Sequence, residues 1–120
     1  MTAVNYRSAM AYDPDLADRV RELVATEDHL TEKRMFGGLA FLVAGNMAVA
    51  AGSGGGLMVR TAPADLDALV DDGHVRPMVM RGRELRGWLL VAAPALAEDE
   101  ALAGWVRHGV AYARTLPPKN

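Results

Sequence analysis

Residues 39–51 read LAFLVAGNMAVAA, in which two apolar runs flank the dipeptide Gly45-Asn46. Gly-Asn between apolar runs is typical of a two-residue turn, so this stretch predicts a β-hairpin in which Leu42 faces Val49. Both faces of such a hairpin are apolar, although a sheet with one face in water alternates apolar and polar residues. We therefore expect its second face to be covered by a helix, by the N-terminal segment or by another subunit.

Further strands are expected on both sides of this hairpin. Residues 32–36 precede it, and residues 57–60 follow the glycine-rich connector 52–56. Between the first strand and the hairpin, the adjacent glycines Gly37-Gly38 predict a bulge or a close approach of two backbones.

A second hairpin is predicted to join residues 78–81 to residues 84–91 around Gly82-Arg83. Strict alternation along its strands divides the side chains between two faces. One face is expected to carry Arg81, Arg86 and Trp88, and the other Met78, Met80, Leu85, Leu89 and Val91.

Two helices are expected before and between these hairpins. Asp13-Pro14 predicts the start of the first, because aspartate caps free amides and proline suits the first helical position. Apolar residues at helical spacing continue it to residue 25, with Asp15 and Arg19 one turn apart and able to pair. A second, short helix over residues 64–70 is expected to stop at Gly73.

The last helix has the clearest pattern of the chain. Acidic residues 98–100 precede it and Pro117-Pro118 follow it, as expected at helix ends. Its apolar stripe, which predicts that Trp105 lies in the core, is formed by Leu102, Trp105, Val106, Gly109, Val110 and Ala113.

The order of these elements is helix, four strands, short helix, two strands, helix. Strands segregated from helices in this way predict the α+β class, with a two-layer arrangement of an antiparallel sheet packed on helices. We expect a single domain over residues 13–120. Residues 1–12 form a leader that we expect to be poorly ordered, and Met10 is an alternative start to Met1.

Composition excludes several classes of protein. The 120 residues contain no cysteine, which excludes disulfide scaffolds, thiol catalysis and cysteine-based zinc or iron–sulfur sites. The net charge of -2 argues against a polyelectrolyte binder. The sequence has neither an apolar run long enough to span a membrane nor a secretory signal, so we expect a cytoplasmic protein.

No pattern of catalytic or metal-binding residues emerges. His29, His74 and His108 are far apart, and none has a second ligand at helical spacing, so we expect no metal site. Ser53 lacks the surroundings of a nucleophile elbow, and residues 52–56 lack the ending of a phosphate-binding loop. We expect neither a cofactor nor enzymatic activity.

Charge is unevenly distributed along the chain. Segments 33–60 and 73–92 together carry a net charge of +6 and the rest carries -8, so the strands are basic and the helices acidic. Basic groups beside an aromatic ring can hold phosphates or stack a base, although we favour pairing with neighbouring acids or solvation. The candidate interaction face consists of Lys33, Arg34, Arg60, Arg81, Arg86 and Trp88.

Five short motifs resemble the TfoX N-terminal-domain family over a match from about Met10 to Lys119. The most specific is the family motif Met35, Phe36, Gly37 and Gly38, which follows the first helix. The others are Gly45-Asn46-Met47, Gly56-Leu57-Met58-Val59-Arg60, Met80-Arg81-Gly82 with Gly87-Trp88, and the helix from Trp105 to Ala113. The resemblance implies a two-layer α+β fold of the secretion-chaperone type.

The resemblance also implies a bacterial regulatory role. TfoX proteins regulate natural competence, act with the cyclic AMP receptor protein at competence promoters, and carry a second, C-terminal domain related to helix-hairpin-helix modules. Since the chain ends at Asn120, we expect that second domain to be missing here.

Taken together, these features predict a small non-enzymatic interaction module in transcription regulation. We expect it to be a homodimer that contacts a protein partner, such as a component of the transcription machinery. One alternative is weak nucleic-acid binding through the basic sheet face. Another is a site for an anion or small ligand, with residues 35–38, Arg60 and Trp88 around a pocket.

Overall fold

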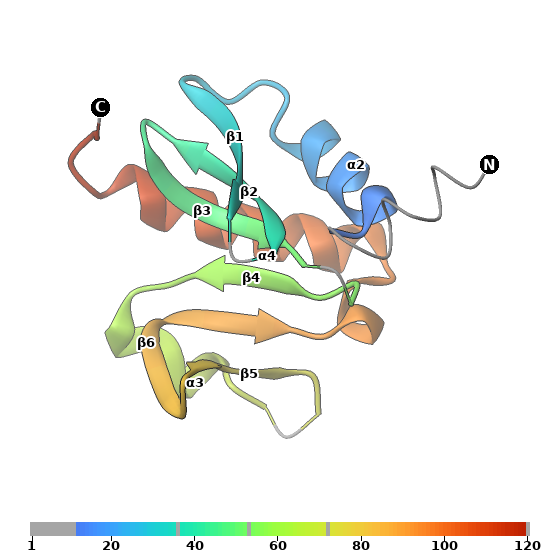
Figure 1. Ribbon diagram of the computed structural model, residues 1–120, viewed down its shortest axis with the longest axis vertical. Coiled ribbons are helices and arrows are strands. Elements are labelled where there is room, and N and C mark those ends of the chain that lie inside the picture. The colour runs from blue at the N-terminus through green and yellow to red at the C-terminus, as the bar shows by residue number, and fades with distance from the viewer. Residues whose placement is uncertain (1–11, 36, 53, 72, 120) are drawn as a thin grey trace.

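In the computed structural model, which describes residues 12–35, 37–52, 54–71 and 73–119, six antiparallel strands form one sheet and the helices cover one of its faces (Figure 1). The strands, in the sheet order β1-β2-β3-β4-β6-β5, are β1 (Leu30–Met35), β2 (Gly38–Val43), β3 (Asn46–Ala51), β4 (Leu57–Arg60), β5 (Val75–Met80) and β6 (Arg83–Val91). The helices are α2 (Pro14–Leu23), α3 (Leu66–Leu69) and α4 (Asp99–Arg114), with 3-10 turns η1 (Pro63–Asp65) and η2 (Ala93–Leu96). The predicted α+β class and element order are confirmed.

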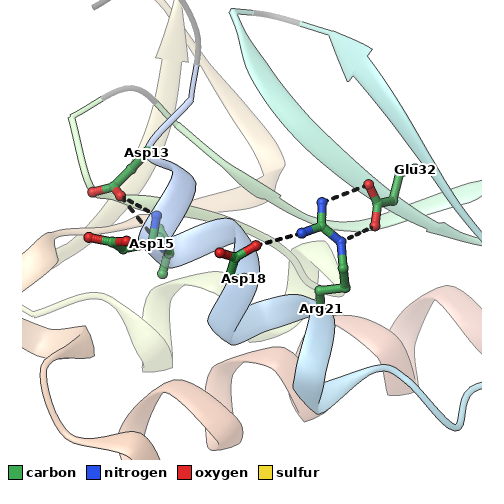
Figure 2. Close-up of polar contacts among 6 residues, drawn as sticks. Asp13, Asp15, Asp18, Arg21 and Glu32 are labelled. Atoms are coloured by element: carbon green, nitrogen blue, oxygen red, sulfur yellow. Dashed lines mark hydrogen bonds and ion pairs between the residues drawn. The ribbon is translucent and has the colours of Figure 1, made fainter. Parts of the chain in front are cut away.

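Helix α2 begins where the sequence predicts. Asp13 Oδ1 accepts hydrogen bonds from the backbone N–H groups of Asp15 (2.9 Å) and Leu16 (3.2 Å), which are two of the four amides that a helix start leaves unpaired (Figure 2). The helix ends at Leu23, two residues before the predicted residue 25. Its buried residues Leu16, Ala17 and Val20 face the core.

The predicted pairing of Asp15 with Arg19 is wrong. Arg19 instead donates to the carbonyl oxygen of Leu96 (2.8 Å) and pairs with Asp99 (3.0 Å) at the start of α4. The guanidinium of Arg19 thus binds two acceptors, a carbonyl oxygen and a carboxylate. Pairing with Asp15 would provide a single carboxylate.

Helix α4 packs directly across the middle of the sheet and runs behind β2, β3 and β4 in Figure 1. Five of its six predicted apolar positions are buried, but Trp105 is half-buried and lies at the margin of the core, where its ring edge contacts His108. The core itself is formed between the helices and alternate strand residues such as Phe41, Val49 and Leu89.

The first hairpin differs from the prediction by one residue. Its turn residues are Ala44 and Gly45, with φ angles of 50° and 84°, so both adopt the left-handed backbone of a type I′ turn. Leu42 consequently pairs with Met47 rather than with Val49, and a bulge lies beside it at Phe41/Leu42.

The C-terminal segment accounts for this register. The buried Asn46 side chain donates to the carbonyl oxygen of Pro117 (2.9 Å), and the Lys119 N–H donates to the carbonyl oxygen of Ala44 (2.7 Å). Asn46 therefore belongs to β3, where it holds the segment after α4, and is not free to serve as a turn residue.

The second hairpin also turns one residue early, at Arg81-Gly82. Pro77 pairs with Leu89 but Met78 pairs with Leu85, so Arg86, Gly87 and Trp88 of β6 have no partner on β5. Trp88 pairs with Arg60 of β4 instead, and the Thr61 N–H bonds to the Gly87 carbonyl oxygen (2.9 Å).

This interruption overturns the predicted alternation in β6. Met78 packs beside Trp88 and Leu90, on the face opposite Leu89 and Val91. Side chains alternate strictly between the two faces only while the two strands pair residue by residue. The three residues of β6 without a partner on β5 are an odd number, so the side chains beyond them point to the face opposite to the predicted one.

The predicted second helix forms as η1 followed by α3, but it ends at Leu69 rather than at Gly73. Beyond it, Asp71 Oδ1 accepts from the N–H groups of Gly73 (2.9 Å), His74 (2.7 Å) and Val75 (2.9 Å). This side chain closes a turn that competes with further helix. Among the described residues, no helix has the length and apolar character needed to cross a membrane.

Candidate functional site

The face of the sheet opposite the helices is apolar and rich in methionine. We call it the methionine face. Its buried residues are Ala40, Met47, Ala50 and Met58, and its half-buried residues are Met35, Leu42, Met78, Trp88 and Leu90. A helix was expected as one cover for this face, but none of the described helices provides it, since α2, α3 and α4 contribute to the core on the other side. The N-terminal segment, residues 1–11, falls outside the described residues together with nearly all of the predicted leader.

The two basic residues of β1 lie on opposite faces. Lys33 is two residues from Met35 and therefore points to the methionine face, whereas Arg34 points to the helical side. There the guanidinium of Arg34 lies over the ring of Tyr12, 5.9 Å from its centroid. The predicted basic face therefore loses Arg34.

Arg60 and Trp88 are neighbours on the methionine face. They are paired across β4 and β6, and the guanidinium carbon of Arg60 lies over the indole ring, 5.0 Å from its centroid. This is a cation–π contact, which orients a cation without neutralising it. Arg60 is half-buried, and none of the ion pairs or side-chain hydrogen bonds formed by the described residues includes it.

Arg86 and Arg81 do not join this pair. Arg86 pairs with Asp67 of α3 (3.4 Å) and with Glu84 (3.6 Å), in agreement with the expected pairing with neighbouring acids. Arg81 is an exposed residue of the β5–β6 turn. Of the six predicted face residues, the structure places Lys33, Arg60 and Trp88 together on one side of the sheet.

Two cavities open on the methionine face, and both include Met58 in their walls. The first, which we call the central cavity, has a volume of about 260 Å³ and is lined by Met35, Met47, Met58, Met80 and Trp88, together with smaller apolar groups, Arg60 and Lys119. The second, the outer cavity, has a volume of about 470 Å³ and is lined by glycines of the 52–56 connector and by His74, Arg76 and Met78. No aspartate or glutamate of the described residues lines either of them.

The family motif lies at the edge of these cavities. Met35 lines the central cavity, and Gly37 lines the outer one with a φ of 73°, which favours glycine. A Cβ on Gly38 would overlap the carbonyl oxygen of Ala51, so the predicted close approach of two backbones is confirmed there. Phe36 lies outside the described residues.

Charge separates the two sides of the sheet. Acidic residues concentrate on the helical side, where Glu32 of β1 receives two hydrogen bonds from Arg21 of α2 (2.6 and 2.9 Å; Figure 2). The Arg21 guanidinium holds the pKa of the Glu32 carboxyl below its usual value, mainly through these hydrogen bonds. Three backbone N–H groups likewise lower the pKa of Asp71. The methionine face, in contrast, presents Lys33, Arg60 and Arg76.

One hydroxyl–imidazole pair was missed by sequence reasoning. Thr61 Oγ1 lies 2.8 Å from Nε2 of His108, which links the end of β4 to α4. Thr61 is fully buried, so this hydroxyl cannot reach a substrate, and the pair satisfies the polar groups of both residues. The described residues contain no group of three side chains suited to hold a metal ion.

The sequence also gave no sign of two basic residues beside the cavities. Lys119 reaches the central cavity only because the chain after α4 returns to the turn between β2 and β3, where the Lys119 N–H bonds to Ala44. Arg76 reaches the outer cavity from an edge strand whose position follows from the sheet order. Neither placement has a local signal in the sequence.

Comparison with known proteins identifies the family but no individual relative. No curated protein and no solved structure matches the chain. The family model described as the TfoX N-terminal domain matches residues 22–113. This range includes the six strands, α3 and all of α4 but its last residue. It also includes the residues that line the two cavities, with the exception of Lys119. The chain therefore belongs to the TfoX N-terminal domain family.

Proposed function

We propose that this protein is a small, non-enzymatic interaction domain with a regulatory role, and that its partner binds to the methionine face. The observation that carries the proposal is the position of the helices α2, α3 and α4 in the described part of the chain, which pack on one side of the sheet while methionines, two leucines and Trp88 are half-buried on the other. A large apolar patch on a sheet face is typical of protein-binding surfaces. Methionine side chains are flexible and polarisable, so they adapt to a partner.

The charges on this face favour a partner of a particular chemistry. Lys33, Arg60 and Arg76 provide positive charge, and no carboxylate of the described residues lines its two cavities. The partner that complements it is a protein segment with apolar side chains flanked by aspartate or glutamate. Such charge complementarity speeds association and selects against basic partners.

A second copy of the chain fits the same face less well. In a two-fold dimer through identical surfaces, the positive charges of one copy, Arg60 and Arg76 among them, meet a surface that carries the same positive charges. Like charges that meet in this way oppose association. The homodimer expected from the sequence remains a prediction, and it is one outcome of the experiment below.

Adjacent residues of β5 provide a matched pair of variants for the test. Met78 packs on the methionine face, whereas Val79 is 56% exposed and, as the next residue along the strand, points to the other side. The measurement is affinity capture from the source cells with the wild-type chain, Met78→Glu and Val79→Glu as baits. It is combined with photo-crosslinking through methionine analogues, with and without nuclease.

The proposal expects a protein that is captured by the wild type and by Val79→Glu but lost with Met78→Glu. Its crosslinked peptide should come from an acidic, apolar segment. A partner lost equally from both variants, or crosslinked only to the helical side, contradicts the proposal. Capture that disappears with nuclease supports the nucleic-acid alternative instead. Light scattering that gives twice the monomer mass for the wild type, and the monomer mass for Met78→Glu, supports the homodimer.

The central cavity favours a second candidate function, the binding of a small anion or ligand. Residues 35–38, Arg60 and Trp88 were expected around one pocket; Met35, Arg60 and Trp88 line this cavity, whereas Gly37 lines the outer one. The nucleic-acid alternative has less support, because Arg34 and Arg86 lie on the helical side or pair with acids.

A further inference from the structure

We propose that the central cavity is a binding site for a small molecule with an apolar body and one carboxylate, and that Arg60 holds the carboxylate. This proposal rests on the second candidate function, the binding of a small ligand in the central cavity, and does not depend on the protein partner. It rests on the state of Arg60, on the walls of the cavity and on the position of Lys119.

Arg60 is prepared to bind an anion. The residue is half-buried and its guanidinium lies over Trp88, so the contact with the ring limits the conformations of a long side chain. Within the described part of the chain, no carboxylate pairs with it and no acceptor receives a hydrogen bond from it. A guanidinium carries five N–H donors in a planar fork that matches the two oxygens of a carboxylate.

Other arginines of the protein have guanidinium groups that are already hydrogen-bonded to acceptors. Arg21 donates to both oxygens of Glu32, and Arg19 bonds a carbonyl oxygen and Asp99. These arginines lie on the helical side, where acids are plentiful. Arg60 lies on the side where no aspartate or glutamate of the described residues lines a cavity, so its guanidinium is open to an anion from solution.

The remaining walls of the cavity determine the body of the ligand. Four methionines, two leucines and Trp88 line it, so the group attached to the carboxylate is apolar. The volume of about 260 Å³ is slightly below the usual range for ligand sites, which selects a small molecule such as a short fatty acid or an arylacetic acid. Flexible methionine side chains allow both shapes.

Lys119 adds a second positive charge and connects the site to the C-terminal segment. It lines the cavity, and its backbone N–H donates to the carbonyl oxygen of Ala44 at the first hairpin turn. A Cβ on Gly45 would overlap the Lys119 backbone, so the segment lies directly against the turn. An anionic ligand beside Lys119 is therefore expected to stabilise the docked position of this segment.

The test uses octanoate and phenylacetate as probes, with octan-1-ol as the uncharged match for octanoate. Binding is measured by titration calorimetry and by NMR of isotope-labelled methionine methyl groups, assigned by single Met→Leu variants. Four of the seven methionines line the central cavity, and Met78 lines only the outer one, so the methyl spectrum locates the ligand. The variants are Arg60→Gln and its control Arg83→Gln, an exposed arginine of β6 that lines neither cavity.

The proposal expects octanoate to shift the methyl signals of Met35, Met47, Met58 and Met80 and to bind at least about tenfold more tightly than octan-1-ol. Arg60→Gln should weaken octanoate binding by about tenfold or more and leave octan-1-ol unchanged, whereas Arg83→Gln should change neither. Octanoate should also slow hydrogen exchange at the Lys119 amide. If Arg60→Gln does not fold, Arg60→Lys retains the charge without the fork and is expected to weaken octanoate severalfold.

Three results would overturn the proposal. The first is equal binding of octanoate and octan-1-ol, which means an apolar cavity without an anion site. The second is equal weakening by Arg60→Gln and Arg83→Gln, which means attraction by overall charge. The third is the absence of any methyl shift, or shifts confined to Met78, with both carboxylates.

Discussion

Gly109 of α4 lies against the carbonyl oxygen of Ala48 in β3, with no space for a side chain between them. A Cβ at this position would overlap that oxygen and lie 2.8 Å from Cγ1 of Val49. Helix and sheet thus meet at this point through a residue without a side chain. Because α4 crosses three strands, this contact sets the distance between the two layers.

Gly109→Ala should therefore destabilise the fold, although alanine is the better helix former. Overpacking typically costs about 1–3 kcal/mol, against a gain of about 1 kcal/mol from helix propensity. Gly104→Ala in the same helix is the control, since the nearest atom to its Cβ is the end of the Arg107 side chain at 4.0 Å. Urea unfolding should show a loss for Gly109→Ala and a gain of about 0.5–1 kcal/mol for Gly104→Ala.

Trp105→Ala should cost less than the loss of a core aromatic residue. Its ring is half-buried at the margin of the core, so we expect about 1–2 kcal/mol, compared with about 3–5 kcal/mol for Phe41→Ala, which is fully buried. Unfolding free energies of the two variants check this order. If Trp105→Ala is as costly as Phe41→Ala, the ring is part of the core after all.

Acid should weaken the fold through Glu32 and Asp71. The pKa values of both carboxyls are lowered in the folded state, Glu32 mainly by the hydrogen bonds from Arg21 and Asp71 mainly by backbone N–H groups. Their contribution to stability is complete above the ordinary carboxyl pKa of about 4 and is lost as pH falls through the lower folded values.

The measurement is unfolding by urea from pH 7 to pH 2. Glu32→Gln and Asp71→Asn should each lower stability at pH 7 and flatten the acid side of the stability curve. An acid limb as steep as that of the wild type in both variants would assign the pH dependence to other groups.

Asn46→Ala should release the C-terminal segment. The buried Asn46 amide donates to the Pro117 carbonyl oxygen, and the loss of such a hydrogen bond costs about 0.5–1.5 kcal/mol. Hydrogen exchange at the Lys119 amide should become faster, because that amide bonds to Ala44 beside the same turn. Thr115→Ala is the control, since its hydroxyl bonds only to the nearby Tyr112 carbonyl oxygen. Unchanged exchange at Lys119 would show that Asn46 does not hold the segment.

The two hairpins show where sequence reasoning reached its limit. Both were located correctly from apolar runs around glycine, but both turns lie one residue earlier than predicted, at Ala44-Gly45 and Arg81-Gly82. In each case a residue other than glycine adopts a left-handed backbone, against local preference. At the first turn, contacts with residues more than seventy positions away favour this geometry, and no local pattern includes them.

The candidate site shows the same division. Residues 35–38, Arg60 and Trp88 were expected around one pocket, of which Met35, Arg60 and Trp88 line the central cavity and Gly37 lines the outer one. Arg86 and Arg34 were assigned to the same face. The interruption of the pairing between β5 and β6, and the ion pair with Asp67, place Arg86 outside the central cavity. Strand alternation turns Arg34 to the helical side. Lys119 could not be placed, because its position depends on the path of the chain after α4.

The sequence by itself determined the elements, their order, the α+β class and the uneven charge of strands and helices. These features follow from local periodicity, capping residues and composition, which act over a few neighbouring residues. Only the tertiary structure decided the registers, the face on which each basic residue lies and the union of Arg60, Trp88 and Lys119 around one cavity. Bulges and long-range hydrogen bonds decide the registers and the faces. Such interactions stabilise the fold only after distant segments of the chain have come into contact.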